Sequence, residues 1–167
     1  MPLLFDSGSD SVRERLEDMP SEQFPAGTEI LAAGTSTGKL FILVSGTARV
    51  SKDDVPLGEL SEPGAVVGEL SALLGQPHGA NVHAVTDCTF RVADAAEFLQ
   101  SDSSAALLVA TILARRLDAA NTALIEVRKE VAAGKPQGVI SRALDKLANA
   151  LRQDIDPELA RYVNVWM

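Results

Sequence analysis

Apolar residues recur at two different spacings along this chain, and the change of spacing divides it into segments. From about residue 24 to residue 92, short apolar runs alternate with polar positions, most clearly over residues 47–51 and 88–92. Nine of the twelve glycines fall between Gly27 and Gly79, so the runs are bounded by residues that favour turns. This pattern predicts many short strands, and therefore a mainly β fold of the sandwich or jelly-roll barrel type.

Helical spacing of apolar residues occurs on both sides of this β-rich part. Before it, residues 11–19 have an amphipathic pattern with a cap at Ser9 or Asp10, and Pro20 ends the predicted helix. After it, the pattern predicts a short helix at residues 94–100 and a long helix at residues 103–131. A break at residues 133–138 follows, and two further helical segments are predicted at residues 139–151 and from residue 157 onward.

One apolar stripe runs the length of the predicted long helix. Its members follow in alternating steps of four and three residues, which is the period of a coiled-coil seam; they are Ala106, Ala110, Leu113, Leu117, Ala120, Leu124, Val127 and Val131. A helix that packs only on its own β-domain is one explanation. The stripe is longer and more regular than the face such a domain covers, so we expect a parallel two-fold homodimer through this helix.

Length and composition are those of one globular domain with appendages. We expect an N-terminal helix over residues 1–23, a β-rich domain with the long helix over 24–133, and a C-terminal helical extension over 134–167. Apolar residues make up 46% of the 167, yet no apolar run approaches membrane-spanning length and the N-terminus lacks a signal-peptide pattern. The single cysteine, Cys88, is expected to be a buried thiol, and a cytoplasmic protein is the expectation.

Charge and site chemistry narrow the classes of function. Fifteen basic against twenty-three acidic residues give a net charge of −8, so binding of DNA is not expected. His78 and His83 with one cysteine do not form a metal-ligand set of familiar spacing. No catalytic triad, paired carboxylates or P-loop stands out. The sequence therefore predicts no metal, no catalytic residues and no enzyme.

The stretch from Gly64 to Ala84 is the most informative part of the chain. It reads as a strand end, a break at Gly68, a short helix over residues 69–74, a second break over 75–79, and a new strand. A glycine before a short helix lets the backbone approach a ligand while the first helical N–H groups point outward, which is the arrangement of an anion cradle. The same pattern also serves as a plain corner.

The motifs on either side of this stretch add a family resemblance. They are Phe-Pro-Ala-Gly-Thr at 24–28, Gly34, the run 40–50, residues 87–92, residues 97–99, and Ala-Arg-Arg-Leu at 114–117. In this order and spacing, roughly residues 20–131 resemble the cyclic-nucleotide-binding domain of the catabolite-activator type. The resemblance implies a double-stranded β-helix or jelly-roll barrel followed by a long dimerisation helix and C-terminal helices.

The resemblance also implies a ligand site, which this chain preserves in part. In the family, a phosphate cassette begins Gly-Glu-Leu, where the glutamate holds the ribose hydroxyl, and ends Arg-Ser/Thr-Ala, where the arginine and backbone amides hold the cyclic phosphate. The first part matches at Gly68, Glu69 and Leu70, with Ser71 following; the second part is replaced by His78, Gly79 and Ala80.

The missing arginine bears directly on affinity. Arginine offers a permanent charge and a forked set of donors, whereas His78 offers two diverging donors and is mostly neutral at pH 7. Each lost charge-assisted hydrogen bond weakens the free energy of binding by roughly 1.5–3 kcal/mol. Micromolar affinity corresponds to a total free energy of binding of only about −8 kcal/mol. His78 is therefore either a weaker phosphate contact or a residue of the loop surface, and the second alternative is favoured.

The long helix carries two further candidates. Arg116 matches an arginine that pairs with the cassette glutamate in the family, and its alternative is a solvated helix charge. Asn121 matches a polar position that reads the base across the dimer. Glu69 either faces a ligand or serves as a structural partner for Arg116. His83 should point outward from its strand.

The resemblance finally suggests what the protein does. Transcription factors of the family append a winged helix-turn-helix, but only 36 residues follow Val131 and they lack that pattern. The leading hypothesis is a regulatory or sensor module that binds a cyclic nucleotide, cAMP or cGMP, weakly or in a modified way and signals through its helices. The alternative is a degenerate fold that binds no nucleotide and acts as a dimeric interaction scaffold, with a protein partner on its C-terminal helices.

Overall fold

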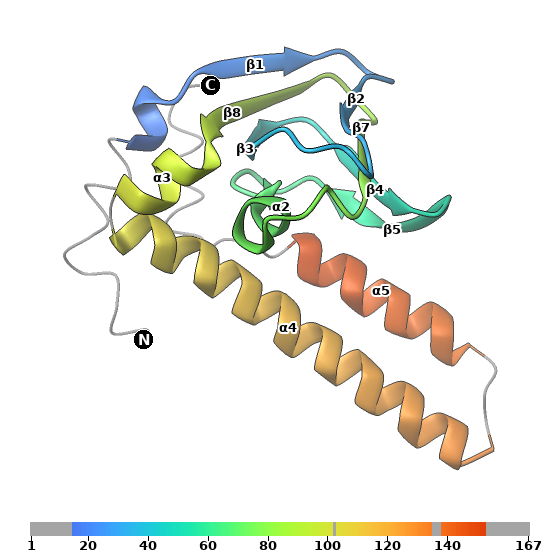
Figure 1. The fold of residues 1–167 in the computed structure, drawn as a ribbon. Helices are drawn as coiled ribbons and strands as arrows, with labels where there is room; N and C mark the ends of the chain where they lie inside the picture. The colour runs from blue at the N-terminus through green and yellow to red at the C-terminus, as the bar shows by residue number, and fades with distance from the viewer. Residues whose placement is uncertain (1–14, 102, 135–137, 153–167) are drawn as a thin grey trace.

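The computed structural model describes residues 15–101, 103–134 and 138–152. Within them, the β-rich part forms two antiparallel four-stranded sheets that face each other (Figure 1). The first sheet has the order β1 (Ser21–Phe24), β8 (Cys88–Asp94), β3 (Lys39–Ser45), β6 (Val66–Val67). The second has the order β2 (Glu29–Leu31), β7 (Asn81–Ala84), β4 (Ala48–Lys52), β5 (Val55–Leu60). The predicted mainly β, jelly-roll class is confirmed.

The predicted jelly-roll barrel is not closed, because the two sheets stay separate. No ladder joins them in the described residues. The edge strands β6 and β2 hold only two and three residues, so they are too short to continue a ladder around the corner. Short edges also leave few unpaired backbone groups for another chain to bind.

Strand β3 is apolar over residues 40–43 because this part of it is buried on both faces. Phe41 and Leu43 point into the core between the sheets, while Leu40 and Ile42 belong to a second core beneath the helices. Phe41 also packs edge-to-face with Phe24 and Phe90, at ring-centroid distances of 6.3 Å each. This strand thus ties the sandwich to the helical layer.

The helices lie where the sequence predicts them. The described helices are α2 (Glu69–Leu74), α3 (Ala95–Ser101), α4 (Ser103–Ala132) and α5 (Val139–Arg152). Residues 15–18 form a helical turn that ends before Pro20, as expected. The predicted segment from residue 157 lies outside the described residues.

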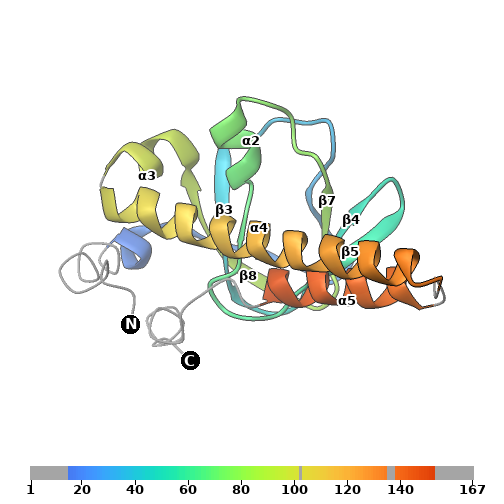
Figure 2. The same cartoon turned by 90° about the horizontal axis from the view of Figure 1, so that it is seen from below.

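Helices α4 and α5 form an antiparallel hairpin beside the sandwich (Figures 1 and 2). Two ion pairs join them, Arg142 with Glu130 and Lys146 with Glu126. The other side of α5 packs against strand β5. Helix α5 therefore packs against two parts of its own chain, helix α4 and the second sheet.

Helix α4 carries two apolar faces, of which one is covered. The buried face packs on the sandwich and consists of Ala105, Leu108, Val109 and Ile112. The stripe predicted for a dimer lies mostly on another face, although its member Leu113 packs against this same core. Its members Leu117, Leu124 and Val131, seven residues apart, are 62%, 66% and 58% exposed.

The buried thiol predicted for the single cysteine is confirmed. Cys88 is a buried free thiol, and burial raises its pKa. The polar turn between β4 and β5 has positive φ at both Asp53 and Asp54, as a type I′ hairpin requires. Among the helices of the described residues, none combines the length and apolar character needed to span a membrane.

Candidate functional site

Gly68 is required by the packing of the sandwich. It is the N-cap of α2 with φ +92°, in the left-handed region that favours glycine. A Cβ atom at this position would lie 2.5 Å from the carbonyl oxygen of Lys39 on strand β3. The glycine that begins the cassette therefore has a structural reason, independent of any ligand.

Glu69 and Arg116 form the buried ion pair that the family resemblance implied. Arg116 Nη1 lies 2.5 Å from Glu69 Oε1, and its Nη2 donates to the carbonyl oxygen of Val66 at 2.7 Å. The Glu69 side chain is only 3% exposed. One guanidinium on α4 thus holds both the start of α2 and the strand before it, so the solvated-charge alternative for Arg116 is wrong.

Ser71 closes the end of helix α2. Its hydroxyl donates to the carbonyl oxygen of Gln76 at 2.6 Å, and its own carbonyl oxygen accepts from the backbone N–H groups of Gly75 and Gln76. Gly75 adopts the left-handed conformation typical of a helix C-cap. The Ser71 hydroxyl therefore stabilises the turn that follows α2.

His78 is buried, so its favoured placement on the loop surface is wrong. Its side chain faces the loop between β2 and β3, where Nε2 lies 3.3 Å from the backbone nitrogen of Thr37 and 3.0 Å from the Thr37 hydroxyl. Its backbone is bonded to the same loop, through Thr35 and Gly34. His78 therefore joins its own loop to the loop between β2 and β3.

The hydrogen bonds determine which His78 nitrogen carries the proton. Nε2 accepts the backbone N–H of Thr37, and the Thr37 hydroxyl accepts the backbone N–H of Lys39 at 3.2 Å. The hydroxyl is then oriented to donate to Nε2. This network requires a neutral ring with its proton on Nδ1. Burial acts in the same direction, because it lowers the pKa of His78 below its usual value of 6.5.

We expect His78 to make the fold sensitive to acid. Because the pKa of His78 is lowered in the folded state, the unfolded chain binds a proton at this residue first as the pH falls. The contribution of neutral His78 to the free energy of unfolding is therefore complete above pH 6.5 and declines as the pH falls below it. Urea unfolding between pH 8 and pH 5 should show a steeper loss of the free energy of unfolding for the wild type than for His78→Gln. His83→Gln removes the other histidine, and equal losses in the wild type and both variants would contradict the role of His78.

The remaining candidates occupy varied positions. Leu70 is half exposed on α2, Gly79 is exposed, and Ala80 packs at the edge of the core. Asn121 is exposed on α4. It is four residues from Leu117 and three from Leu124, so it lies with the exposed stripe rather than beside the cassette-facing Arg116.

Sequence reasoning missed the residues that hold the cassette from outside. Thr37 contacts His78 across 41 residues, and the acceptor at Val66 is a backbone carbonyl. A backbone carbonyl has no side-chain signature, and Thr37 lies in a hydroxyl-rich loop that reads as an ordinary turn. His83 does point outward, 3.4 Å from Glu29. The described residues contain no group of histidines, cysteines and carboxylates arranged to hold a metal.

Comparison with known proteins identifies the class. Residues 21–101 match the family model of the cyclic nucleotide-binding domain, and no curated protein matches the sequence. The two four-stranded sheets and the cassette before α3 occupy this same range. Residues 21–101 therefore belong to the cyclic nucleotide-binding domain family.

Solved structures share the fold over more of the chain. The catabolite activator protein of Thermus thermophilus is 22% identical with a TM-score of 0.59, covering 89% of this chain and 87% of that one. A cyclic nucleotide-binding domain from Methylobacillus flagellatus is 22% identical with a TM-score of 0.53, covering 62% of each. A regulatory subunit of a cAMP-independent protein kinase A from Trypanosoma brucei is 28% identical with a TM-score of 0.50, covering 57% of this chain but only 36% of that one.

Proposed function

We propose that this chain is a regulatory module in which the state of the cassette is passed to helix α4, and that cyclic nucleotides bind it weakly. The observation that carries the proposal is the double engagement of Arg116, with Glu69 at the start of α2 and with the backbone of Val66. A ligand that displaced either group would move the arginine, and with it the helix on which it stands. The family match supports a regulatory role.

Weak binding is proposed because the phosphate position lacks a permanent charge. His78 is neutral in its hydrogen-bonded state and its ring is turned toward Thr37. To contact a phosphate it would have to give up that loop, in addition to lacking the forked donors of arginine. Acid that protonates His78 would release the ring from Thr37 and favour an anion, so affinity should rise as the pH falls.

The test restores the family's residues. The variant His78→Arg with Gly79→Ser should bind cAMP or cGMP at least tenfold more tightly than the wild type in calorimetry, because charge-assisted hydrogen bonds contribute about 1.5–3 kcal/mol each. The position of Gly79 is open, since nothing lies within 4 Å of a Cβ built there. Thermal unfolding checks that the variant is folded.

His83→Arg is the matched control, because it adds the same charge on a strand outside the cassette and should leave the affinity unchanged. Low-micromolar binding by the wild type that His78→Ala does not alter would refute the claim that the absent arginine weakens the site.

A second candidate, a scaffold that binds no nucleotide, is favoured by a different observation. The polar side chains of the cassette have partners within the chain: Glu69 with Arg116, Ser71 with Gln76. The kinase subunit from Trypanosoma brucei, cAMP-independent by its description, offers a precedent at 28% identity. No calorimetric signal even after both cassette replacements would favour this scaffold.

We also propose that two copies pair through α4. The exposed residues Leu117, Leu124 and Val131 form one seam at seven-residue spacing, and Asn121 lies among them. A parallel pairing would bury this seam and place Asn121 at the interface, as the family's dimers would place it. The α4–α5 hairpin leaves the seam uncovered.

Charged residues in the seam should produce monomers. Leu117→Glu with Leu124→Glu should halve the mass seen by light scattering at tens of micromolar, because buried charges without partners are costly. Both side chains are exposed in the single chain, so its fold should be retained. Val55→Glu with Val85→Glu changes two other exposed apolar residues and should keep the dimer. A wild type that is already monomeric would contradict the pairing.

A further inference from the structure

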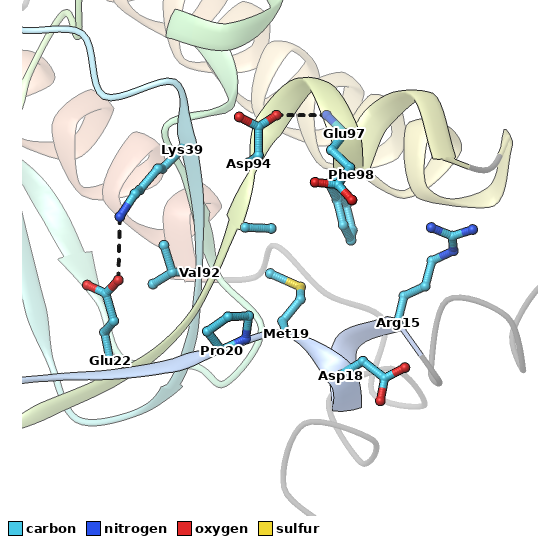
Figure 3. Close-up of a pocket in the computed structure, with 11 residues that line it drawn as sticks. Arg15, Asp18, Met19, Pro20, Glu22, Lys39, Val92, Asp94, Glu97 and Phe98 are labelled. Atoms are coloured by element: carbon cyan, nitrogen blue, oxygen red, sulfur yellow. Dashed lines mark hydrogen bonds and ion pairs between the residues drawn. The ribbon is translucent and has the colours of Figure 1, made fainter.

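A cavity of about 490 Å³ lies outside the cassette, between the first described residues, the ends of β3 and β8, and helix α3 (Figure 3). None of its lining residues belongs to the stretch 64–84. Its volume falls within the roughly 300–1,000 Å³ of ligand pockets. Neither the proposed nucleotide site nor the proposed dimer seam uses it.

The cavity is framed by contacts that hold its walls in place. Arg91 Nη1 donates to the carbonyl oxygen of Met19 at 2.8 Å, and the backbone N–H of Val92 donates to the carbonyl oxygen of Pro20 at 2.9 Å. These bonds fix the chain before β1 against strand β8. On the opposite side, Asp94 caps helix α3 by accepting the backbone N–H of Glu97 at 2.9 Å. The walls are therefore formed without a ligand.

The floor of the cavity is apolar. Met19, Val92 and Phe98 meet there, and each is buried within the protein. Figure 3 shows the side chains of Met19 and Phe98 facing each other across the space, with Pro20 and Val92 beside them. An apolar ligand group could therefore be enclosed on several sides.

The rim of the cavity is acidic. Four carboxylates stand around the floor, from Asp18, Glu22, Asp94 and Glu97. Against them the lining has two basic residues, and both have partners: Lys39 lies 3.6 Å from Glu22, and Arg15 donates to the carbonyl oxygen of Ser101 at 3.2 Å. The rim thus keeps a net charge of −2 around an apolar centre.

We infer that this cavity is a docking site for a basic peptide segment of a partner protein, with an apolar side chain between lysines or arginines. The carboxylates come from the chain before β1, from β1, from β8 and from α3, so they surround the floor on several sides. A single cation could meet only part of this ring. A peptide whose basic residues flank an apolar anchor meets the rim and the floor together.

The test uses a labelled peptide and the whole chain. The probe is fluorescein-labelled Gly-Lys-Leu-Arg-Phe-Lys-Gly with blocked ends, followed by fluorescence anisotropy. Asp18→Asn with Glu97→Gln should weaken its binding about three- to tenfold, as expected for two partly exposed ion pairs. The matched control is Asp53→Asn with Asp54→Asn, which removes the same charge at the distant β4–β5 turn, where asparagine tolerates the positive φ. This control should retain the wild-type affinity.

Two further measurements separate docking in the cavity from general attraction to an acidic protein. A peptide with serine at both apolar positions should bind at least tenfold more weakly, and NMR shifts on titration should centre on the backbone amides of Val92, Ala93 and Phe98. Equal weakening by the control variant, shifts centred elsewhere, or no binding of the probe at about 1 mM would overturn the inference. Each of these outcomes is independent of nucleotide binding at the cassette.

Discussion

Replacing Arg116 with methionine is expected to lower the free energy of unfolding by about 3–5 kcal/mol, the range observed when one partner of a buried ion pair is removed. Methionine keeps an unbranched apolar stem but no guanidinium. The Glu69 carboxylate, 3% exposed, loses its counter-charge, and the carbonyl oxygen of Val66 loses a donor. Urea unfolding followed by circular dichroism measures the change.

Two comparisons make this experiment specific. Arg115→Met makes the same change one residue earlier, on an exposed position of α4, and should cost less than about 0.5 kcal/mol. Pairing Arg116→Met with Glu69→Leu removes both charges and should recover much of the loss, because apolar pairs often replace buried ion pairs without cost. If Arg116→Met destabilises no more than Arg115→Met, the arginine does not connect the cassette to α4.

Replacing Gly68 with alanine should destabilise the fold by a similar amount. An alanine at φ +92° costs about 1–2 kcal/mol, and its Cβ would lie 2.5 Å from the carbonyl oxygen of Lys39, so overpacking adds about 1–3 kcal/mol. The start of α2 would have to move away from strand β3. The free energy of unfolding in urea gives the size of the effect.

Gly75→Ala is the matched control at the other end of the same helix. Gly75 is also left-handed, with φ +62°, but nothing lies within 4 Å of a Cβ built there. Its replacement should therefore lower the free energy of unfolding only by the cost of placing alanine at a positive φ, about 1–2 kcal/mol. Equal losses for the two glycines would mean that the close approach to Lys39 has no energetic consequence.

The same two glycines show how far local sequence determines this fold. Turns, caps and the period of apolar residues depend on neighbours within a few positions, so the sequence predicted α4 to within one residue of Ser103–Ala132. It also indicated the short helix between Gly68 and Gly75, and the alternation of strands around it. The Gly-Glu-Leu start of the cassette, together with the motifs on either side of it, suggested the family that the comparison confirms.

Only the tertiary structure decided how these elements use their side chains. The burial of His78 depends on Thr37, 41 residues away, and the role of Glu69 depends on Arg116, 47 residues away. No local pattern encodes such pairs, because they form when separate elements meet. For the same reason the sequence could not say that the sheets remain separate, that α5 packs against β5, or which apolar face of α4 the sandwich covers. Those outcomes depend on strand lengths and on the space left between packed elements, and both exist only in the folded chain.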